Sequence, residues 1–460
     1  MIVSILITSI CMWLAYVLLC RRYFPVNEQV ATCPGKWPLI GHALQLMNTK
    51  GKFPTWKRNR KVLDLCFKQH ILDDYLQLFN ERAERFVETL AEDVGQGEVD
   101  LKKKISRSVL ETTCRTTLGI NRDGMNDIND NYAKAINDCL DTLSDRIYKP
   151  WLIVDAVFNL SSDKKKLDKA LETIFEFSEK VSTIIKETVV CTKVNQTVLL
   201  RKAERVECLQ KNEDFNHKGK SVLDVILENT ITETKSAFTD TQLRNLMDNM
   251  LLAAFDTTIY QMNLVLVCIG SSSEVQDKIL QERMNLILGK DGRLKGDNLS
   301  QLVYLDAVVK EAIRLYPVGP LVGRTTTTHT KLRNVTIPAG SSVVVHIWGT
   351  NRNPRQWGPD AEEFRPERWL DSTMPAHQAA FATFGPGKRG CVGNDYLYNL
   401  LYLVFVKAGK TYALMYIKAT VVSLLRKYKI TADHKKLKLE CKIMFKPLSG
   451  HLIEIEERNK

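Results

Sequence analysis

The sequence predicts a mainly α-helical protein with a small β region, preceded by an N-terminal membrane anchor. Between residues 61 and 193 apolar residues recur with helical spacing, as in Leu76 to Leu90 and Asp163 to Ile185, and this spacing is typical of amphipathic helices. Thr239 to Ile269 is a long apolar-rich segment and the best candidate for a central helix. Leu332 to Ile347 alternates between apolar and polar residues, which indicates short strands.

The composition is that of a basic globular protein. Among 460 residues, 65 are Lys or Arg and 53 are Asp or Glu, which gives a net charge of +12. This excess suits an acidic partner or an anionic membrane face. Because it is spread along the chain without a basic tail, we expect no nucleic-acid partner. The 11 cysteines include no CxxC pair, so neither a disulfide framework nor a zinc ribbon is indicated and a reducing compartment is expected.

The N-terminal stretch predicts an uncleaved anchor. Ile2 to Cys20 contains no charged residue and would form a helix of about 28 Å, close to the thickness of a bilayer core. Arg21 and Arg22 follow directly, which favours a cytosolic location for the rest of the chain. The alternative is a buried core helix. We therefore expect an anchor at 1–20, a proline-rich hinge at 21–50 and a globular domain at 51–460.

A glycine-rich loop around one cysteine carries the clearest chemical signal. The run Phe384 to Gly393 reads FGPGKRGCVG, and glycines allow such a loop to bend sharply around a bound group. Lys388 and Arg389 beside Cys391 favour the thiolate, which is the form that ligates metal. The alternative is a surface turn with a buried cysteine.

The complete pattern Phe-x-x-Gly-x-Arg-x-Cys-x-Gly resembles the haem-ligand loop of the cytochrome P450 superfamily. The resemblance implies the mainly α P450 fold. It also implies that Cys391 is the axial thiolate on the iron of a non-covalent haem b, a ligand that favours O–O cleavage. Phe384, Gly387 and Arg389 would contact the same haem.

A second motif lies in the middle of the apolar segment, at Ala253 to Thr258 (AAFDTT). An acid followed by hydroxyl residues is locally unfavourable in a helix interior. The motif resembles the distal oxygen-activation motif of the family, which implies that Asp256 and Thr257 relay protons to dioxygen. The alternative is that the threonines bond to their own helix and Asp256 faces solvent. Ala254 replaces the usual glycine, and Ala253 replaces the glutamate that can esterify haem in family-four enzymes, so we expect no covalent haem link there.

A charged pair marks a further helix near Val308 to Pro317. Glu311 and Arg314 stand three residues apart, a spacing that on a helix surface contributes only ~0.2–0.5 kcal/mol. The pair also resembles the Glu-x-x-Arg signature of the family. The resemblance implies that Arg368, from Phe364 to Trp369, completes a buried cluster that fixes the loop leading to the cysteine.

The resemblance extends to propionate ligands and to the substrate pocket. Trp56 and Arg60 share one helix face and resemble a Trp-x-x-x-Arg propionate pair, and Arg324 resembles a second propionate ligand. Val318, Leu321 and Val322 would line the substrate cavity, with Leu448 and Ser449 from a late turn, although each of these could equally belong to the core. Phe255 would line the cavity as well.

Two departures from the family pattern stand out. Several dozen residues that roof the pocket in related enzymes are missing between Thr55 and Trp56. After the cysteine loop, Asp395 to Lys410 intervenes before the expected helix at Tyr412 to Lys418. We expect this insertion to displace that helix from the thiolate.

The resemblance implies a microsomal haem-thiolate monooxygenase, most like insect members of the family-four clan. It would insert one oxygen atom of dioxygen into a hydrophobic substrate. Two alternatives stay open: a haem-thiolate isomerase or dehydratase, and a non-catalytic remnant that cannot hold haem.

The implied partners are an NADPH-dependent flavoprotein reductase, with cytochrome b5 as a second donor, and a hydrophobic small molecule. Lys388 is a candidate contact for the acidic reductase. The implied location is the endoplasmic reticulum membrane, with the catalytic domain on the cytosolic face.

Overall fold

The computed structural model describes residues 59–60, 62–119, 126–174, 220–232, 238–282, 293–332, 334–371, 375, 377–385, 391, 408–450 and 452–458. The chain divides into two compact units. The larger one comprises Lys50–Ser144, Ser162–Val322 and His346–Lys460, and the smaller one comprises Met1–Thr49, Asp145–Ser161 and Gly323–Val345. The predicted anchor at 1–20 and hinge at 21–50 lie outside the described residues.

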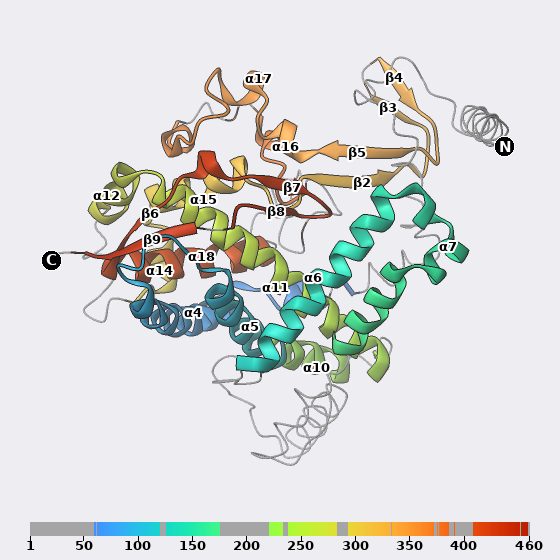
Figure 1. The fold of residues 1–460 in the computed structure, drawn as a ribbon, viewed down its shortest axis with the longest axis horizontal. Helices are drawn as coiled ribbons and strands as arrows, with labels where there is room; N and C mark the ends of the chain where they lie inside the picture. Colours follow the sequence, from blue (N-terminus) through green and yellow to red (C-terminus); the bar gives the residue numbers. More distant parts are fainter. Residues whose placement is uncertain are drawn as a thin grey trace, which may run out of the picture. The chain divides into compact units, whose positions relative to one another are not determined.

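Helices make up most of the larger unit (Figure 1). Residues 162–174 are helical as well. Helix α6 (Asn126–Tyr148) begins in the larger unit, and its last residues, from Asp145 on, belong to the smaller unit. The named helices are α4 (Gln69–Thr89), α5 (Lys102–Leu118), α6 (Asn126–Tyr148), α10 (Val222–Thr232), α11 (Asp240–Gly270), α12 (Ser273–Gln281), α14 (Gly296–Leu299), α15 (Val303–Leu315), α16 (Ile347–Thr350), α17 (Pro354–Trp357) and α18 (Ala408–Lys427).

Short strands complete both units. In the larger unit β1 (Val99–Asp100), β9 (Leu452–Glu457) and β6 (Tyr428–Thr431) form one antiparallel sheet, and β7 (Leu439–Cys441) pairs with β8 (Phe445–Pro447). The smaller unit holds α7 (Asp155–Leu160) and the antiparallel pair β3 (Thr330–Leu332) and β4 (Val335–Ile337). It also holds most of the sheet made by β2 (Leu321–Thr325) and β5 (Ser342–His346). The predicted fold class, mainly α with a small β region, is confirmed.

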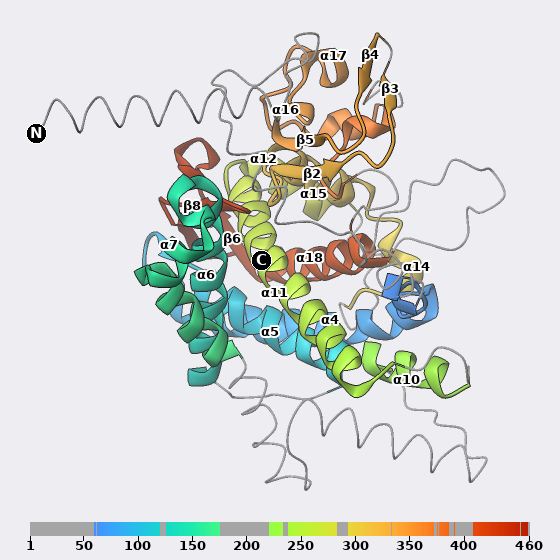
Figure 2. The same ribbon diagram turned by 90° about the vertical axis from the view of Figure 1, so that its right-hand side faces the viewer.

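The central helix α11 has 31 residues and runs from near α12 toward α10 (Figure 2), one residue offset from the segment expected from the sequence. Thr239 caps its N-terminus in a reciprocal capping box, in which the Gln242 amide donates to the Thr239 hydroxyl at 3.2 Å. Asn245–Gly270 is the one segment of the described chain that is long and apolar enough to cross a membrane. Since 78% of its most apolar window is buried in the protein, it has the character of a core helix.

Helix α18 packs against α4 and α5 through aromatic rings with paired hydroxyl groups. The Phe79 ring lies 5.0 Å from that of Tyr412 and 5.3 Å from that of Tyr416. The Tyr412 hydroxyl pairs with Thr116 at 2.9 Å and the Tyr416 hydroxyl with Ser108 at 2.8 Å. These contacts fix both the rotation and the axial position of α18.

The start of α18 differs from the sequence expectation. The helix begins at Ala408, so the last three residues of the predicted insertion, 408–410, form its first turn. The expected displacement of this helix therefore does not prevent it from packing on α4, α11 and α15. The physical reason is that the apolar face of α18 continues through Tyr412, Met415 and Tyr416, whose burial determines where the helix lies.

Candidate functional site

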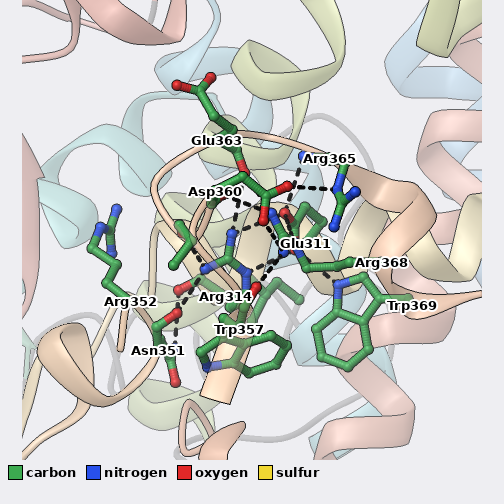
Figure 3. A network of polar contacts seen from close by, with 12 residues as sticks. Glu311, Arg314, Asn351, Arg352, Trp357, Asp360, Glu363, Arg365, Arg368 and Trp369 are labelled. Carbon is green, nitrogen blue, oxygen red and sulfur yellow. Dashed lines mark hydrogen bonds and ion pairs between the residues drawn. The ribbon is translucent and has the colours of Figure 1, made fainter. Parts of the chain in front are cut away.

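A buried carboxylate, that of Glu311 on α15, lies at the centre of a polar network in the larger unit (Figure 3). Arg314 donates to it through two nitrogens, Nε to Oε2 at 2.8 Å and Nη2 to Oε1 at 2.9 Å. Arg368 donates from Nε to Oε1 at 2.8 Å. The Arg365 amide at 3.0 Å and the Trp369 indole at 2.9 Å add two more donors. The predicted Glu311–Arg314–Arg368 cluster therefore exists, and it is fully buried.

The outer nitrogens of the two arginines hold backbone carbonyls of an irregular segment. Arg314 Nη1 donates to the carbonyls of Asn351 and Ala361, both at 2.6 Å. Arg368 donates to the carbonyls of Trp357 at 2.7 Å and Asp360 at 2.8 Å. A segment with little sheet pairing must find partners for its buried carbonyls elsewhere, and here the cluster supplies them.

Asn351 connects the cluster to the segment that precedes the cysteine. Its amide nitrogen donates to the Arg314 carbonyl at 2.9 Å and to the Thr383 hydroxyl at 2.7 Å. Its amide oxygen accepts from the Ala382 N–H at 3.2 Å. This role of Asn351 is not evident from the sequence, because the residue contacts partners more than thirty positions away on both sides and no periodic pattern marks it.

The cysteine loop begins where this chain of contacts ends. The Cys391 N–H donates to the Phe384 carbonyl at 2.7 Å, and the Cys391 side chain is exposed. Gly385 adopts a φ of 72°, a conformation that favours glycine at this position. Gly387, Lys388 and Arg389 lie outside the described residues, so their predicted contacts stay predictions.

Aromatic rings form a second connection between the cluster and the loop. The Trp357 and Trp369 rings lie 5.2 Å apart, Trp369 and Phe381 lie 4.9 Å apart, and Phe381 and Phe384 lie 6.2 Å apart. The Arg314 guanidinium lies 5.1 Å from the centre of the Trp357 ring. Glu311 is therefore connected to the start of the cysteine loop both by hydrogen bonds and by contacts between aromatic rings.

In the distal motif on α11, the side chains of Asp256 and Thr257 differ in their exposure to solvent. Asp256 is 3% exposed, whereas Thr257 is exposed and donates its hydroxyl to the Ala253 carbonyl at 2.7 Å. The alternative in which Asp256 faces solvent is therefore wrong, while the self-bonding of the threonine does occur. Phe255 is 1% exposed, and its ring centre lies 5.7 Å from that of Tyr132, so its predicted place in the substrate pocket stays a prediction.

Burial raises the pKa of Asp256 to about 6, and Lys446 and Lys102 oppose this rise only in part. Its Oδ2 has no hydrogen-bond partner among the described residues. Lys446 is itself engaged by Asp141 at 2.6 Å, and Lys102 lies 3.3 Å from the Tyr260 hydroxyl. These neighbours come from α5, α6, α11 and β8, and no local sequence pattern links those elements.

The remaining predicted site residues are spread over several elements. Arg60 is 8% exposed and pairs with Asp64 at 2.9 Å, whereas Arg324, in the smaller unit, donates to the Gly323 carbonyl at 2.8 Å. Trp56 lies outside the described residues. Among the expected pocket residues, Val318 packs in the core with Tyr260 and Leu264, Val322 is half-buried, and Leu321 and Leu448 are exposed. Their assignment to propionates or a pocket stays a prediction.

The donor chemistry of the larger unit fits a haem. The thiol of Cys391 is exposed, and its backbone N–H is bonded to the Phe384 carbonyl, which suits an axial ligand. On α11 the small side chains of Ala253 and Thr257 are exposed, whereas the neighbouring Phe255 and Asp256 are buried. A strip of small accessible residues on a core helix is what a flat planar group requires.

The mainly α fold is that of the haem-thiolate proteins of one family. Residues 33–395 match the family model described as Cytochrome P450, which is more than half of the chain. The chain belongs to the cytochrome P450 family.

Several curated relatives carry family-four names, as expected from the sequence. Human "Cytochrome P450 4V2" is 27% identical over 426 residues, covering 92% of this chain and 75% of that protein. "Cytochrome P450 4c3" of Drosophila melanogaster is 26% identical over 438 residues with the same coverage. "Probable cytochrome P450 4p2" of the same species is 29% identical over 349 residues, covering 74% of this chain and 64% of that protein.

Replacing the central carboxylate tests the cluster. Glu311→Gln keeps the shape of the side chain but turns an NH2 group toward donors, and two buried arginines lose their counter-charge. We expect the free energy of unfolding to fall by about 3–5 kcal/mol, measured by urea unfolding of the full chain. Glu274→Gln, at an exposed carboxylate paired with Lys278, is the control and should have little effect. An equal loss in both variants would contradict the central role of Glu311.

The burial of Asp256 predicts a pH effect on stability. Because the folded-state pKa is about 6 and the ordinary value is 3.8, the folded state holds its proton more tightly. The stability contribution of this group should therefore fall as pH rises from 4 through 6, by about 3 kcal/mol in total. Asp256→Asn should remove this fall in urea unfolding measured across pH, whereas the exposed-site control Asp168→Asn should keep it. Parallel profiles for the parent chain and Asp256→Asn would refute the assignment.

Proposed function

We propose that this chain is a haem-thiolate monooxygenase that inserts one oxygen atom of dioxygen into a hydrophobic substrate, such as a fatty acid, a hormone or a xenobiotic. The observation that carries the proposal is the hydrogen-bonded path from Glu311 to the amide of Cys391. A buried ionic cluster is costly to assemble. Its connection to a glycine-rich cysteine loop is best explained by the need to hold that thiol in one place.

The cofactor of the proposal is a non-covalent haem b, with Cys391 as the axial thiolate. Phe384, Gly387 and Arg389 would contact it from the loop, and Trp56, Arg60 and Arg324 would hold its propionates through charge-assisted bonds. When bound, the haem supplies the activation of dioxygen. Ala253 has no carboxylate, so no ester to the haem forms at that position.

Asp256 and Thr257 would handle the protons of the reaction. A carboxyl group with a pKa of about 6 exchanges its proton readily near neutral pH. The Thr257 hydroxyl donates its hydrogen bond to the Ala253 carbonyl, so its oxygen lone pairs are available to accept a hydrogen bond. Asp256 would thus supply protons from the protein interior, and Thr257 would position the group that accepts them.

Electrons would come from NADPH through a flavoprotein reductase, with cytochrome b5 as a second donor. The net charge of +12 supports docking of an acidic partner, and Lys388 is a candidate contact. The uncharged Ile2–Cys20 followed by two arginines supports an anchor in the endoplasmic reticulum membrane with the body in the cytosol.

Ligation by Cys391 is tested by the carbon-monoxide difference spectrum of the reduced, full-length protein. The parent chain should show the Soret band typical of thiolate ligation, and Cys391→Ser should lose it, because a serine hydroxyl does not supply a thiolate. Cys441→Ser, at another exposed cysteine, is the matched control and should keep the band.

Two results would overturn the proposal. If the parent chain binds no haem, the polypeptide is a non-catalytic remnant. If Cys391→Ser keeps the parent spectrum, the ligand is a different residue.

The role of Thr257 is tested by the coupling of NADPH consumption to product formation. Thr257→Ala removes the hydroxyl that orders the proton acceptor, so the oxygenated product formed per NADPH consumed should fall by roughly 10-fold or more. Haem content should stay at the parent level because the side chain is not a ligand. Thr257→Ser keeps the hydroxyl and should retain most of the coupling. Full coupling in the alanine variant would exclude Thr257 from proton delivery.

A further inference from the structure

The first turn of α18 carries a lysine that contacts the aromatic end of the cysteine loop. The ammonium of Lys410 lies 5.3 Å from the centre of the Phe381 ring and 5.4 Å from that of Phe384. Both distances lie within the range in which a cation is attracted to a ring face. Lys410 is the last residue of the segment that the sequence analysis treated as an insertion, so the family pattern does not predict this contact.

The two rings are the last members of the path that begins at Glu311. Phe381 packs against Trp369 at 4.9 Å, and the Trp369 indole donates to Glu311 at 2.9 Å. Phe384 provides the carbonyl that accepts the Cys391 N–H at 2.7 Å. A group that holds these two rings therefore acts on the backbone of the cysteine loop.

The position of Lys410 within its helix also favours a specific contact. A positive charge near the N-terminus of a helix is disfavoured by the helix dipole, and the first turn of α18 contains no acidic side chain to offset it. The faces of the two rings carry partial negative charge and provide that compensation. By contrast, Lys427 stands in the last turn of α18, where a cation is favoured in any case.

We propose that Lys410 is a positioning residue that clamps Phe381 and Phe384 and so holds the Cys391 loop against the first turn of α18. The consequence for ligation rests on the proposed haem-thiolate function, whereas the clamp itself is a property of the polypeptide. The segment 395–410 thus contributes its final residue to the site.

The experiment uses the full-length chain and three variants. Lys410→Met keeps the length and the apolar contact of the side chain but removes the charge, and Lys410→Arg keeps a cation over the rings. Lys427→Met is the matched control, because Lys427 lies 5.1 Å from the Tyr428 ring at the opposite end of the same helix.

The first readout is hydrogen–deuterium exchange of the peptide covering 381–391, measured without added haem. We expect exchange in Lys410→Met to be about two- to fivefold faster than in the parent chain, the ratio that loss of one cation–ring contact gives. Lys410→Arg and Lys427→Met should match the parent. The second readout is the reduced carbon-monoxide spectrum, in which Lys410→Met should convert faster from the thiolate-type band to the band of a displaced thiolate, and Lys410→Arg should restore the parent rate.

Each outcome decides one statement. Unchanged exchange in a folded Lys410→Met, or exchange in Lys410→Arg as fast as in Lys410→Met, overturns the clamp even if haem binds. Absence of haem in the parent chain overturns the proposed function, while the exchange measurement still decides the clamp. If Lys410→Met does not fold, Lys410→Gln replaces it, because glutamine also removes the charge. Exchange at the parent rate in a folded Lys410→Gln would overturn the clamp.

Discussion

The ion pair between Glu311 and its two arginines is the interaction on which the rest of the site depends. Transferring a carboxylate and two guanidinium groups out of water is costly, and only multiple charge-assisted bonds offset that cost. Five donors on Glu311 meet this condition. The cluster fixes the geometry of its surroundings, because the outer nitrogens of Arg314 and Arg368 bind carbonyls of an irregular segment that no sheet supports.

The two sides of the site solve opposite physical problems. On the cysteine side, each carboxylate oxygen of Glu311 accepts more than one hydrogen bond. On the α11 side, Asp256 is buried with one oxygen lacking a partner among the described residues and with its pKa raised. Folding alone would select against such a carboxyl group, and perturbed acids of this kind concentrate at functional sites. This contrast supports the proposed roles of the two sides, in which the cluster holds the cysteine in place and Asp256 exchanges protons.

The sequence predicted the elements better than the contacts between them. The bounds of α11 and the Glu311–Arg314 pair follow from periodicity and spacing, and Arg368 followed from a motif. The link through Asn351 and the lysines around Asp256 were missed. Both join elements far apart in the chain, and neither side of such a contact leaves a local pattern. The start of α18 was missed for a related reason, since tertiary packing decides how far a helix extends.

The position of α18 bears on whether the segment after the cysteine disrupts the site. The segment that connects Cys391 to α18 is held independently at its two ends. The Cys391 N–H donates to the Phe384 carbonyl, and the hydroxyl pairs of Tyr412 and Tyr416 hold α18. When both ends of a connection are anchored, added length costs only closure entropy, about 0.6 kcal/mol for each doubling. That cost is small beside the several kcal/mol of a buried ionic cluster. An insertion at this point therefore does not break the contacts that connect the Cys391 backbone to the Glu311 cluster.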